Sequence, residues 1–554
     1  MKVNVFLLLI LFGAVFLKNI FFWGKIIQMK DYRFDRLKEF FGSPEGIRSI
    51  FNIYNGFYFL FIFFFAVFTY FLITFKTKIF GLYSPSPEIL GVISFSIYYA
   101  LILLYLTFEF VLVARKFYKK NLVTPKFTKR FILISFVGIL LQISSLIIGY
   151  KIGLENIFSL VFFILIFTPI FLFLGNILTL PITKYLRNKV IINAQNKIKK
   201  FDNLKKIGIT GSYGKSSVKQ FLYQILKVKY KVLATPENKN NEMGVSETIL
   251  ESLNENYEYF ISEMGAYRIG EIALLGEIVD HKDAFLTGIN TQHISLFGSQ
   301  ENIIKGKSEI MRKVLKNGGK LYINFDNDFC KNLDFPEGLK IVSYALTNID
   351  AKALSQIIEI DNGKTIFDFR YGTHEFIFET NIIGTHNILN LTGVIAYALD
   401  QGIPITDIAQ VISSLEMPKA TMNVIKLKNG IILIDDTYNL NETGLIKGTE
   451  TLSFFKNKNK ILVLDDIIEL GLETENIHKK IGENLANIGL DYIFLVGKNY
   501  KKLVIEGLKK SNFDMNKLIG GYEELEDLSK KDVVILFEGR GTRNFLENFK
   551  RKIL

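Results

Sequence analysis

Residues Ile207–Ser217 read I-G-I-T-G-S-Y-G-K-S-S, and this stretch sets the architecture that we predict for the rest of the chain. An apolar strand is predicted over Lys206–Ile209, and a helix over Val218–Leu226 follows the glycine-rich turn. In such a turn, backbone N–H groups and the helix N-terminus face an anion, a lysine reaches the outer phosphates, and a hydroxyl group binds Mg²⁺. The segment therefore predicts an ATP site, and its predicted contacts are Gly211, Ser212, Gly214, Lys215, Ser216 and Ser217.

The match to the general phosphate-loop pattern is partial, because that pattern has a glycine where this chain has Ile209. A tight turn without any ligand is the alternative interpretation. The position of the turn, between a predicted strand and a predicted helix, favours the phosphate site.

Composition narrows the class of protein. Of the 554 residues, 49% are hydrophobic, and the apolar residues concentrate before residue 181. The single cysteine, Cys330, excludes a disulfide framework within the chain and a zinc site built from cysteines. The net charge of +13 suggests nucleic acid as a partner, but much of the excess lies beside apolar segments. This arrangement favours membrane lipid as a partner and argues against nucleic acid.

Five apolar stretches approach or exceed the roughly 20 residues needed to cross a bilayer. They are Val5–Trp23, Tyr54–Phe75, Ile89–Ala114, Phe131–Tyr150 and Ile157–Leu180. Basic loops stay on the cytoplasmic side, so we predict a multi-pass protein of the cell (inner) membrane with its N-terminus outside and its C-terminal part in the cytoplasm. A cleaved signal peptide is the alternative for the first stretch, which Lys18 interrupts, and Glu109 in the third either has a function or reaches the interface.

Strand-like and helical runs alternate from residue 203 onward, which predicts a parallel sheet covered by helices. The runs after Pro418 predict a second, smaller α/β unit. The predicted fold is therefore an α-helical transmembrane region of about five helices over residues 1–202, a central ATP-binding α/β domain over 203–418 and a Rossmann-like α/β domain over 419–554.

Seven further motifs follow the phosphate loop in order. They are Thr235–Val245 (T-P-E-N-K-N-N-E-M-G-V), Ser262–Ala266 (S-E-M-G-A), Asn290–Gly298 (N-T-Q-H-I-S-L-F-G), Lys307–Ile310 (K-S-E-I), Gly384–Asn390 (G-T-H-N-I-L-N), Ile434–Asn441 (I-D-D-T-Y-N-L-N) and Leu464–Gly471 (L-D-D-I-I-E-L-G). As a set they resemble the Mur ligases, ATP-dependent amide-forming enzymes of cell-wall peptide assembly. Within that family the chain is most similar to the ligases that add D-alanyl-D-alanine. The resemblance covers about residues 203–554.

The resemblance implies a catalytic centre with two Mg²⁺ ions. Ser216, Glu263 and His293 would bind metal, and Lys215, Lys307 and His293 would be catalytic. Lys307 would be carbamylated by CO₂, which converts a cation into an anion able to bridge the two ions. Without the resemblance, these residues have ordinary interpretations: an exposed acid at a strand end, a structural histidine and a solvated lysine.

The resemblance also implies contacts to the nucleotide and the substrates. Asn387 and Asn390 would lie near adenine, and Asp436 would hold the ribose hydroxyls. The substrate-binding residues would be Asn240 and Asn241, which face the acceptor, with Tyr438 and Asn439 close to the phosphates. Asparagines at a helix start or in a loop also serve as plain caps and turns, which is the alternative.

Three positions depart from the family pattern. A glycine is replaced by Glu237, and a Gly-Arg pair by Ala420-Thr421, where Lys419 is a possible substitute for the arginine. A Lys-Gly-Ser segment near the C-terminus is replaced by Glu538-Gly539-Arg540. In addition, nothing before residue 203 resembles the domain with which cytosolic members bind the UDP-sugar end of their substrate.

The predicted function is an ATP-dependent peptide ligase of peptidoglycan precursor synthesis. A carboxylate of a nucleotide- or lipid-linked precursor peptide would form an acyl phosphate, and an amino acid or dipeptide amine, D-alanyl-D-alanine above all, would attack it. Three alternatives remain open: another amide ligase of the superfamily, such as a poly-γ-glutamate synthase; a non-catalytic membrane scaffold; and an ATP-driven transporter, for which a second hydrolysis signature is missing.

Overall fold

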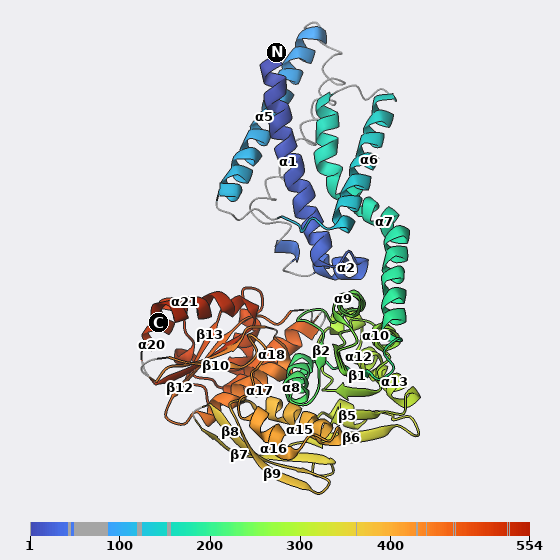
Figure 1. Ribbon diagram of the computed structural model, residues 1–554. Coiled ribbons are helices and arrows are strands. Elements are labelled where there is room, and N and C mark those ends of the chain that lie inside the picture. Colours follow the sequence, from blue (N-terminus) through green and yellow to red (C-terminus); the bar gives the residue numbers. More distant parts are fainter. Residues whose placement is uncertain are drawn as a thin grey trace. The chain divides into compact units, whose positions relative to one another are not determined.

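The computed structural model describes residues 2–42, 46–48, 87–118, 124–151, 157–361, 363–427, 430–438, 440–468, 470, 473–528, 530 and 532–553. The chain divides into two compact units, Met1–Arg187 and Asn188–Leu554. The first unit is helical, and the second contains two β-sheets with helices on their faces (Figure 1).

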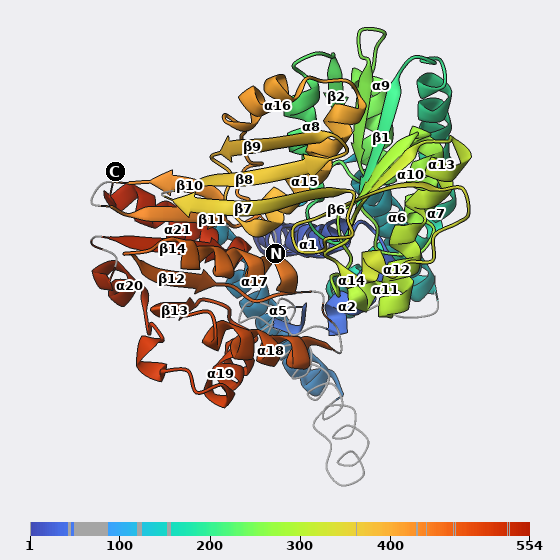
Figure 2. The ribbon, with the colours of Figure 1, turned by 90° about the horizontal axis from the view of Figure 1, so that it is seen from below.

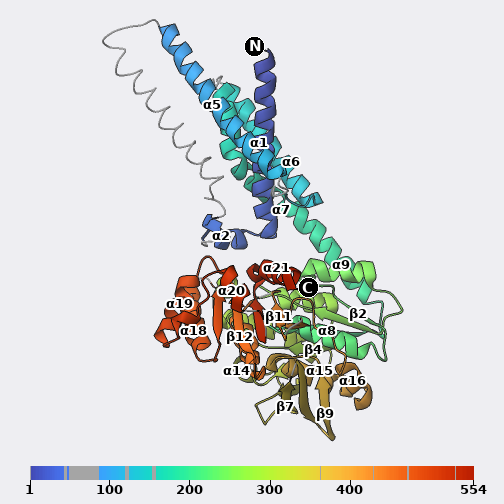
Figure 3. The same ribbon diagram turned by 90° about the vertical axis from the view of Figure 1, so that its left-hand side faces the viewer.

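The first unit consists of long apolar helices, visible in Figure 3. They are α1 (Lys2–Met29), α5 (Pro87–Tyr118), α6 (Lys129–Lys151) and α7 (Ile157–Ile198, which continues into the second unit), together with the short α2 (Phe34–Gly42). In the part of the chain that the structure describes, three helical segments are long and apolar enough to cross a membrane: Ile10–Met29, Lys129–Ile148 and Phe167–Ile198. The predicted stretch Tyr54–Phe75 lies outside the described residues.

A buried ion pair joins two helices of this unit. Lys18 Nζ on α1 contacts Glu109 Oε2 on α5, and the Glu109 side chain is 0% exposed. The suggestion that Glu109 reaches the interface is therefore wrong, since the two charges that interrupt the apolar stretches neutralise each other inside the unit.

Removing one partner of this pair is expected to destabilise the helical unit. Lys18→Met leaves the Glu109 carboxylate buried without its cation, which costs about 3–5 kcal/mol. The double variant Lys18→Met/Glu109→Gln removes both charges and is expected to recover most of that loss. Chemical unfolding of the full-length protein checks this, and equal stability of the single and double variants would contradict it.

The larger sheet of the second unit has nine strands in the order β2-β3-β1-β4-β5-β6-β7-β8-β9. Neighbours are parallel as far as β7, and β7, β8 and β9 pair antiparallel. The strands are β1 (Lys205–Thr210), β2 (Val232–Ala234), β3 (Tyr259–Glu263), β4 (Asp283–Leu286), β5 (Lys320–Asn324), β6 (Lys340–Ala345), β7 (Ala353–Asp361), β8 (Lys364–Tyr371) and β9 (His374–Thr380).

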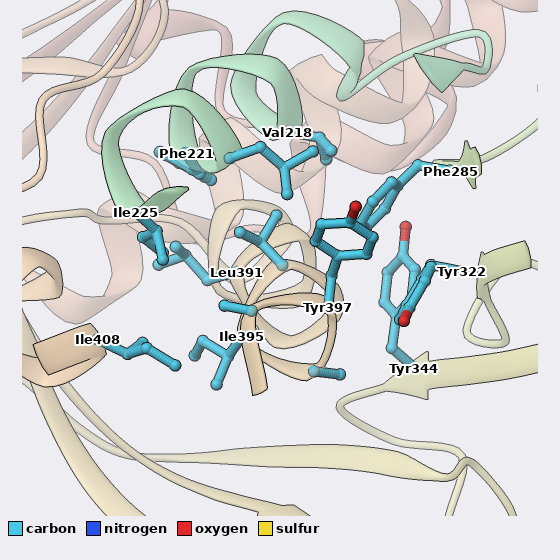
Figure 4. Packing of buried hydrophobic residues seen from close by; sticks show 14 of the residues in the cluster. Val218, Phe221, Ile225, Phe285, Tyr322, Tyr344, Leu391, Ile395, Tyr397 and Ile408 are labelled. Carbon is cyan, nitrogen blue, oxygen red and sulfur yellow. The ribbon is translucent and has the colours of Figure 1, made fainter. Parts of the chain in front are cut away.

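Both faces of this sheet are buried, because successive side chains of each strand point to opposite faces. Phe285 of β4 packs with α8 (Lys215–Leu226), α15 (Thr385–Asp400) and α16 (Ile405–Ile412), and Figure 4 shows this cluster. Its neighbours Ala284 and Leu286 pack on the other face with α9 (Glu242–Ser252), α10 (Glu271–Val279) and α13 (Ile310–Lys316).

The smaller sheet has the order β10-β11-β14-β12-β13 and is parallel except for β10 (Figure 2). Its strands are β10 (Asn423–Lys426), β11 (Ile432–Asp436), β12 (Asn459–Leu464), β13 (Tyr492–Leu495) and β14 (Val533–Glu538). The helices around it are α17 (Glu442–Thr451), α18 (Thr474–Ala486), α19 (Lys501–Lys510), α20 (Tyr522–Leu528) and α21 (Arg543–Ile553). The predicted α/β class, with a parallel central sheet and a smaller C-terminal α/β part, is confirmed.

His281 lies in the core of the second unit, fully buried, with Nε2 3.3 Å from the Ile310 carbonyl oxygen. Burial lowers the pKa of His281 to about 4, so the imidazole is neutral in the folded protein. An unfolded chain has the ordinary histidine pKa of about 6.5. The stabilising contribution of His281 is therefore complete above pH ~6.5 and is lost as the pH falls toward 4, because only the unfolded state binds the proton in that range.

Acidification is thus expected to weaken the second unit through this residue. Between pH 7.5 and pH 5, His281 should account for a loss of about 2 kcal/mol in the free energy of unfolding. His281→Gln does not titrate, so its stability should fall less over the same interval. Urea unfolding of both proteins at the two pH values measures the difference, and parallel pH profiles would contradict the assignment.

Candidate active site

The glycine-rich turn connects β1 to α8. Gly214 is the N-cap residue of α8 with φ +76° and no side-chain cap, a left-handed conformation that suits glycine. The first N–H groups of α8 are therefore available to an anion at the positive end of the helix. Lys215 Nζ donates to the carbonyl oxygens of Gly211, at 2.7 Å, and Ser212, at 3.2 Å. The lysine thus lies over its own loop, where the phosphate site was predicted.

The end of β3 brings a carboxylate to this turn. Ile209 and Glu263 are neighbours in the parallel β1–β3 register, so Glu263 ends its strand beside the turn. Ser216 Oγ donates to Glu263 Oε2 at 3.1 Å, and Asn240 Nδ2 donates to Oε1 at 3.1 Å. The structure therefore brings together two predicted metal-binding residues, Ser216 and Glu263, and one predicted substrate residue.

A lysine that the sequence analysis missed completes this cluster. Lys219 Nζ lies 2.8 Å from Glu263 Oε2. Burial alone would raise the pKa of Glu263, but Lys219 and Lys215 lower it below the ordinary value, so the carboxylate is anionic. Burial lowers the pKa of Lys215, and Glu263 partly opposes this effect. The spacing of the sequence could have identified Lys219, because a residue four positions after Lys215 lies on the same face of the helix.

Lys307 is a buried amine on α12 (Gln300–Ser308) with 2% of its surface exposed. Its Nζ donates to the Ala266 carbonyl oxygen at 3.3 Å and lies 5.7 Å from the centre of the Phe297 ring. Burial, with a smaller effect of Lys215, lowers the pKa of Lys307 well below 10.5. A lowered pKa increases the neutral amine, which is the form that attacks an electrophile.

Glu309, which the sequence did not identify as a functional residue, connects the segment of Lys307 to the segment that follows β3. Its carboxylate accepts from the backbone N–H of Gly270 at 2.7 Å and of Ala273 at 3.0 Å. It therefore caps the N-terminus of α10, for which Gly270 provides no side-chain cap. The K-S-E motif contained both residues, but its sequence does not show which helix the glutamate caps.

His293 begins α11 (Ile294–Phe297) with φ +64°, and its ring centre lies 4.6 Å from that of Tyr267. Among the described residues, no group of three or more His, Cys, Asp or Glu side chains is placed to hold a metal ion. The hard oxygen ligands Ser216 and Glu263 do fit one Mg²⁺. A site that also contains His293 is not assembled in the described residues.

The predicted adenine residues lie at the start of α15. Asn387 is 1% exposed, and its Nδ2 donates to the Ile383 carbonyl oxygen at 2.9 Å, which is a local structural bond. Asn390 faces the phosphate loop, since a side-chain carbon added at Gly214 would lie 3.0 Å from Asn390 Oδ1. The structure therefore brings Asn390 to the glycine turn.

Asp436 ends β11 beside Glu538 of β14 in the parallel register. Burial raises the pKa of Asp436 above its ordinary value, and burial together with Asp436 raises the pKa of Glu538. The departure from the family lysine at Glu538 thus places a second acid beside the predicted ribose residue. The two carboxyl groups disfavour simultaneous ionisation.

Side chains of the two α/β parts meet near this site. Tyr438 OH donates to Asn238 Oδ1 at 2.7 Å, and Asn290 Nδ2 donates to Asn441 Oδ1 at 3.1 Å. Asn241, predicted to face the acceptor, caps α9 by accepting from the Gly244 N–H at 2.8 Å. The predicted residue Asn439 lies outside the described residues.

Comparisons with known proteins agree with this geometry. A family profile, the Mur ligase middle domain, matches residues 209–398. The UDP-N-acetylmuramoyl-tripeptide–D-alanyl-D-alanine ligase of Bacillus subtilis is 30% identical over 348 residues, which cover 61% of this chain and 73% of that protein. The chain belongs to the Mur ligase family. The ligase of the same name from Escherichia coli is 28% identical over 292 residues, 53% of this Mur ligase and 64% of the relative.

Solved structures give the same relationship. A structure of MurF from Acinetobacter baumannii has a TM-score of 0.60 and 27% identity, and the match covers 66% of this Mur ligase and 80% of that chain. The MurF ligase from Thermotoga maritima in complex with ADP has a TM-score of 0.58 and 26% identity. This match covers 66% of this Mur ligase and 84% of that chain. The predicted enzyme class, an ATP-dependent ligase that forms amide bonds, and the resemblance to the D-alanyl-D-alanine-adding ligases are confirmed.

The predicted localisation is wrong. It described a multi-pass inner-membrane protein with five crossings and an external N-terminus, whereas the related ligases are soluble cytoplasmic enzymes. Three apolar helical segments of sufficient length are present in the described residues. The prediction failed because helix length, apolar composition and loop charge identify a helix that is able to cross a membrane, and not one that does.

Proposed function

We propose that this Mur ligase joins D-alanyl-D-alanine to the terminal carboxylate of a nucleotide-linked peptidoglycan precursor peptide, with conversion of ATP to ADP and phosphate. The main support for this proposal is that Lys215, Ser216 and Glu263 lie together at one glycine turn. The relatives of the chain are named for this reaction. The precursor and the dipeptide are assigned from those names.

The reaction has two steps. A carboxylate oxygen of the precursor attacks the γ-phosphorus of ATP, the bond to the bridging oxygen breaks, and ADP leaves. The amine nitrogen then attacks the acyl carbon, the nitrogen loses a proton, and phosphate leaves as the amide forms. Lys215 and the N-terminus of α8 would hold the phosphates in position throughout, and their positive charge favours the transferring phosphoryl group.

Ser216 and Glu263 would hold Mg²⁺, because they already share a hydrogen bond and offer oxygen ligands. The ion, when bound, offsets the negative charge that develops during phosphoryl transfer. Asn240 would keep the Glu263 carboxylate oriented through its bond to Oε1. His293 would contribute to a second ion as part of this proposal.

Lys307 would carry a carbamate. Its ammonium group would lose a proton, the neutral amine would attack CO₂ to form a nitrogen–carbon bond, and a second proton would leave the nitrogen, so that a cation becomes an anion. The burial of Lys307 and its lowered pKa support this step. The carbamate would replace a buried positive charge near Lys215 by a negative charge that suits Mg²⁺.

The remaining contacts belong to the same proposal. Asn387 and Asn390 would lie near adenine and Asp436 near ribose, and the substrate residues would be Asn240, Asn241, Tyr438 and Asn439. The domain limits that we propose are a helical region over residues 1–202, a central ATP-binding domain over 203–418 and a C-terminal domain over 419–554.

A product assay tests the proposed function. Full-length protein, ATP and MgCl₂ are incubated with a nucleotide-linked precursor tripeptide and a panel of amines, and products are identified by mass. We expect the amide of D-alanyl-D-alanine, with one ADP formed per amide. Chain extension with L-glutamate instead would favour the poly-γ-glutamate alternative, and absence of any amide would contradict the proposal. A parallel reaction with a lipid-linked precursor tests the predicted lipid partner.

A further inference from the structure

Lys219 lies one helical turn after the phosphate-loop lysine and forms a buried ion pair. Its Nζ is 2.8 Å from Glu263 Oε2, and the two side chains are 8% and 5% exposed. Two charges so far removed from water are stable only while each keeps its partner. Lys219 is therefore bound to Glu263 in the protein without ligands.

The oxygen that Lys219 contacts is the Glu263 oxygen that faces Ser216. Glu263 Oε2 also accepts the Ser216 hydroxyl at 3.1 Å, whereas Oε1 is taken by Asn240 at 3.1 Å. Ser216 and Glu263 would hold an ion through the Ser216 hydroxyl and Oε2, which are oxygen ligands of the kind that Mg²⁺ prefers. The ammonium group and the dication would then compete for one oxygen.

We propose that Lys219 is an internal counter-ion that occupies Glu263 in the metal-free protein and is displaced from Oε2 when Mg²⁺ binds. The proposal rests on the proposed function, since it concerns the same metal site. Lys219 is a positioning residue: it keeps the carboxylate ordered and neutralised beside the turn, and it opposes metal binding until the negative phosphates of the nucleotide compensate the added charge. Mg²⁺ and nucleotide binding are coupled as a result.

Two substitutions of Lys219 should change the Mg²⁺ concentration needed for ADP binding in opposite directions. Lys219→Met removes the competing charge, so the Mg²⁺ concentration that gives half of the full effect on ADP affinity should fall about tenfold. Lys219→Arg keeps the charge and offers a two-pronged guanidinium to the carboxylate, so the same concentration should rise. A purely structural role for Lys219 predicts no such opposition.

The experiment measures ADP affinity by calorimetry over a series of MgCl₂ concentrations, for wild type and both variants. Thermal unfolding in EDTA provides a second readout, in which Lys219→Met should unfold at a lower temperature than wild type because Glu263 loses its cation. Lys227→Met is the matched control, since it removes an exposed lysine that follows the same helix and should change neither readout. If Lys219→Met does not fold, the arginine variant alone still decides the direction.

Equal Mg²⁺ half-effect concentrations in wild type and the position-219 variants would overturn the inference, provided that ADP binding depends on Mg²⁺ and is weakened in Glu263→Gln. A different result would contradict the proposed function itself. In that case wild type and Glu263→Gln would bind ADP with the same affinity, and Mg²⁺ would change the affinity of neither protein.

Discussion

Lys215→Ala is expected to lower ATP-dependent amide formation by about 10³-fold or more, with little change in the temperature of unfolding. Lys215 is the only lysine or arginine of the glycine turn, and its Nζ donates to carbonyl oxygens of its own loop. Loss of one preorganised charge or donor at a transferring phosphoryl group typically costs 10²–10⁵-fold, that is ~3–7 kcal/mol in activation free energy. Coupled measurement of ADP and amide formation gives the rate.

The matched control for this variant is Lys227→Ala, an exposed lysine at the other end of α8. It should retain the rate of wild type. Equal rates for Lys215→Ala and wild type would favour a non-catalytic scaffold over the ligase, because the turn would then have no part in turnover.

Lys307→Ala is expected to reduce amide formation by ~10²–10³-fold, since the variant can form no carbamate at the buried position. Wild type should lose activity in buffer depleted of CO₂ and regain it when bicarbonate is added. Lys307→Glu places a permanent carboxylate near the same point, so its activity, even if low, should not respond to bicarbonate. Rates at fixed pH, with and without bicarbonate, measure these effects.

Lys305→Ala is the control on the same helix, because Lys305 is exposed and Lys307 is buried. It should respond to bicarbonate as wild type does. An active Lys307→Ala protein, or a wild type indifferent to CO₂ removal, would contradict a carbamate at Lys307.

The departures from the family pattern bear on the C-terminal part of the site. Arg540, in the segment that replaces Lys-Gly-Ser, donates from Nε to the Tyr438 carbonyl oxygen at 2.9 Å. Glu538 of the same segment adds an acid beside Asp436. The positive charge of this segment therefore lies at Arg540, against the loop of Tyr438.

Local sequence was sufficient for much of the fold. The strand before Gly211, the helix after Lys215 and the end of a strand at Glu263 were all predicted, because each depends on neighbouring residues: an apolar run, a glycine turn, a helical period. Motif order was sufficient for the family. Local sequence was not sufficient for localisation, because the length of an apolar stretch does not establish that it inserts into a membrane.

Contacts between distant segments could not be read in this way. The pairs Lys219–Glu263 and Lys18–Glu109, and the cap that Glu309 places on α10, join residues that are far apart along the chain. A residue pattern reports the conformation of its own segment, but a partner is chosen by how strands and helices pack, and burial then sets the charge state. The chemistry of Glu263, which is anionic because it pairs with Lys219 and lies near the charge of Lys215, is for this reason a property of the folded unit rather than of any motif.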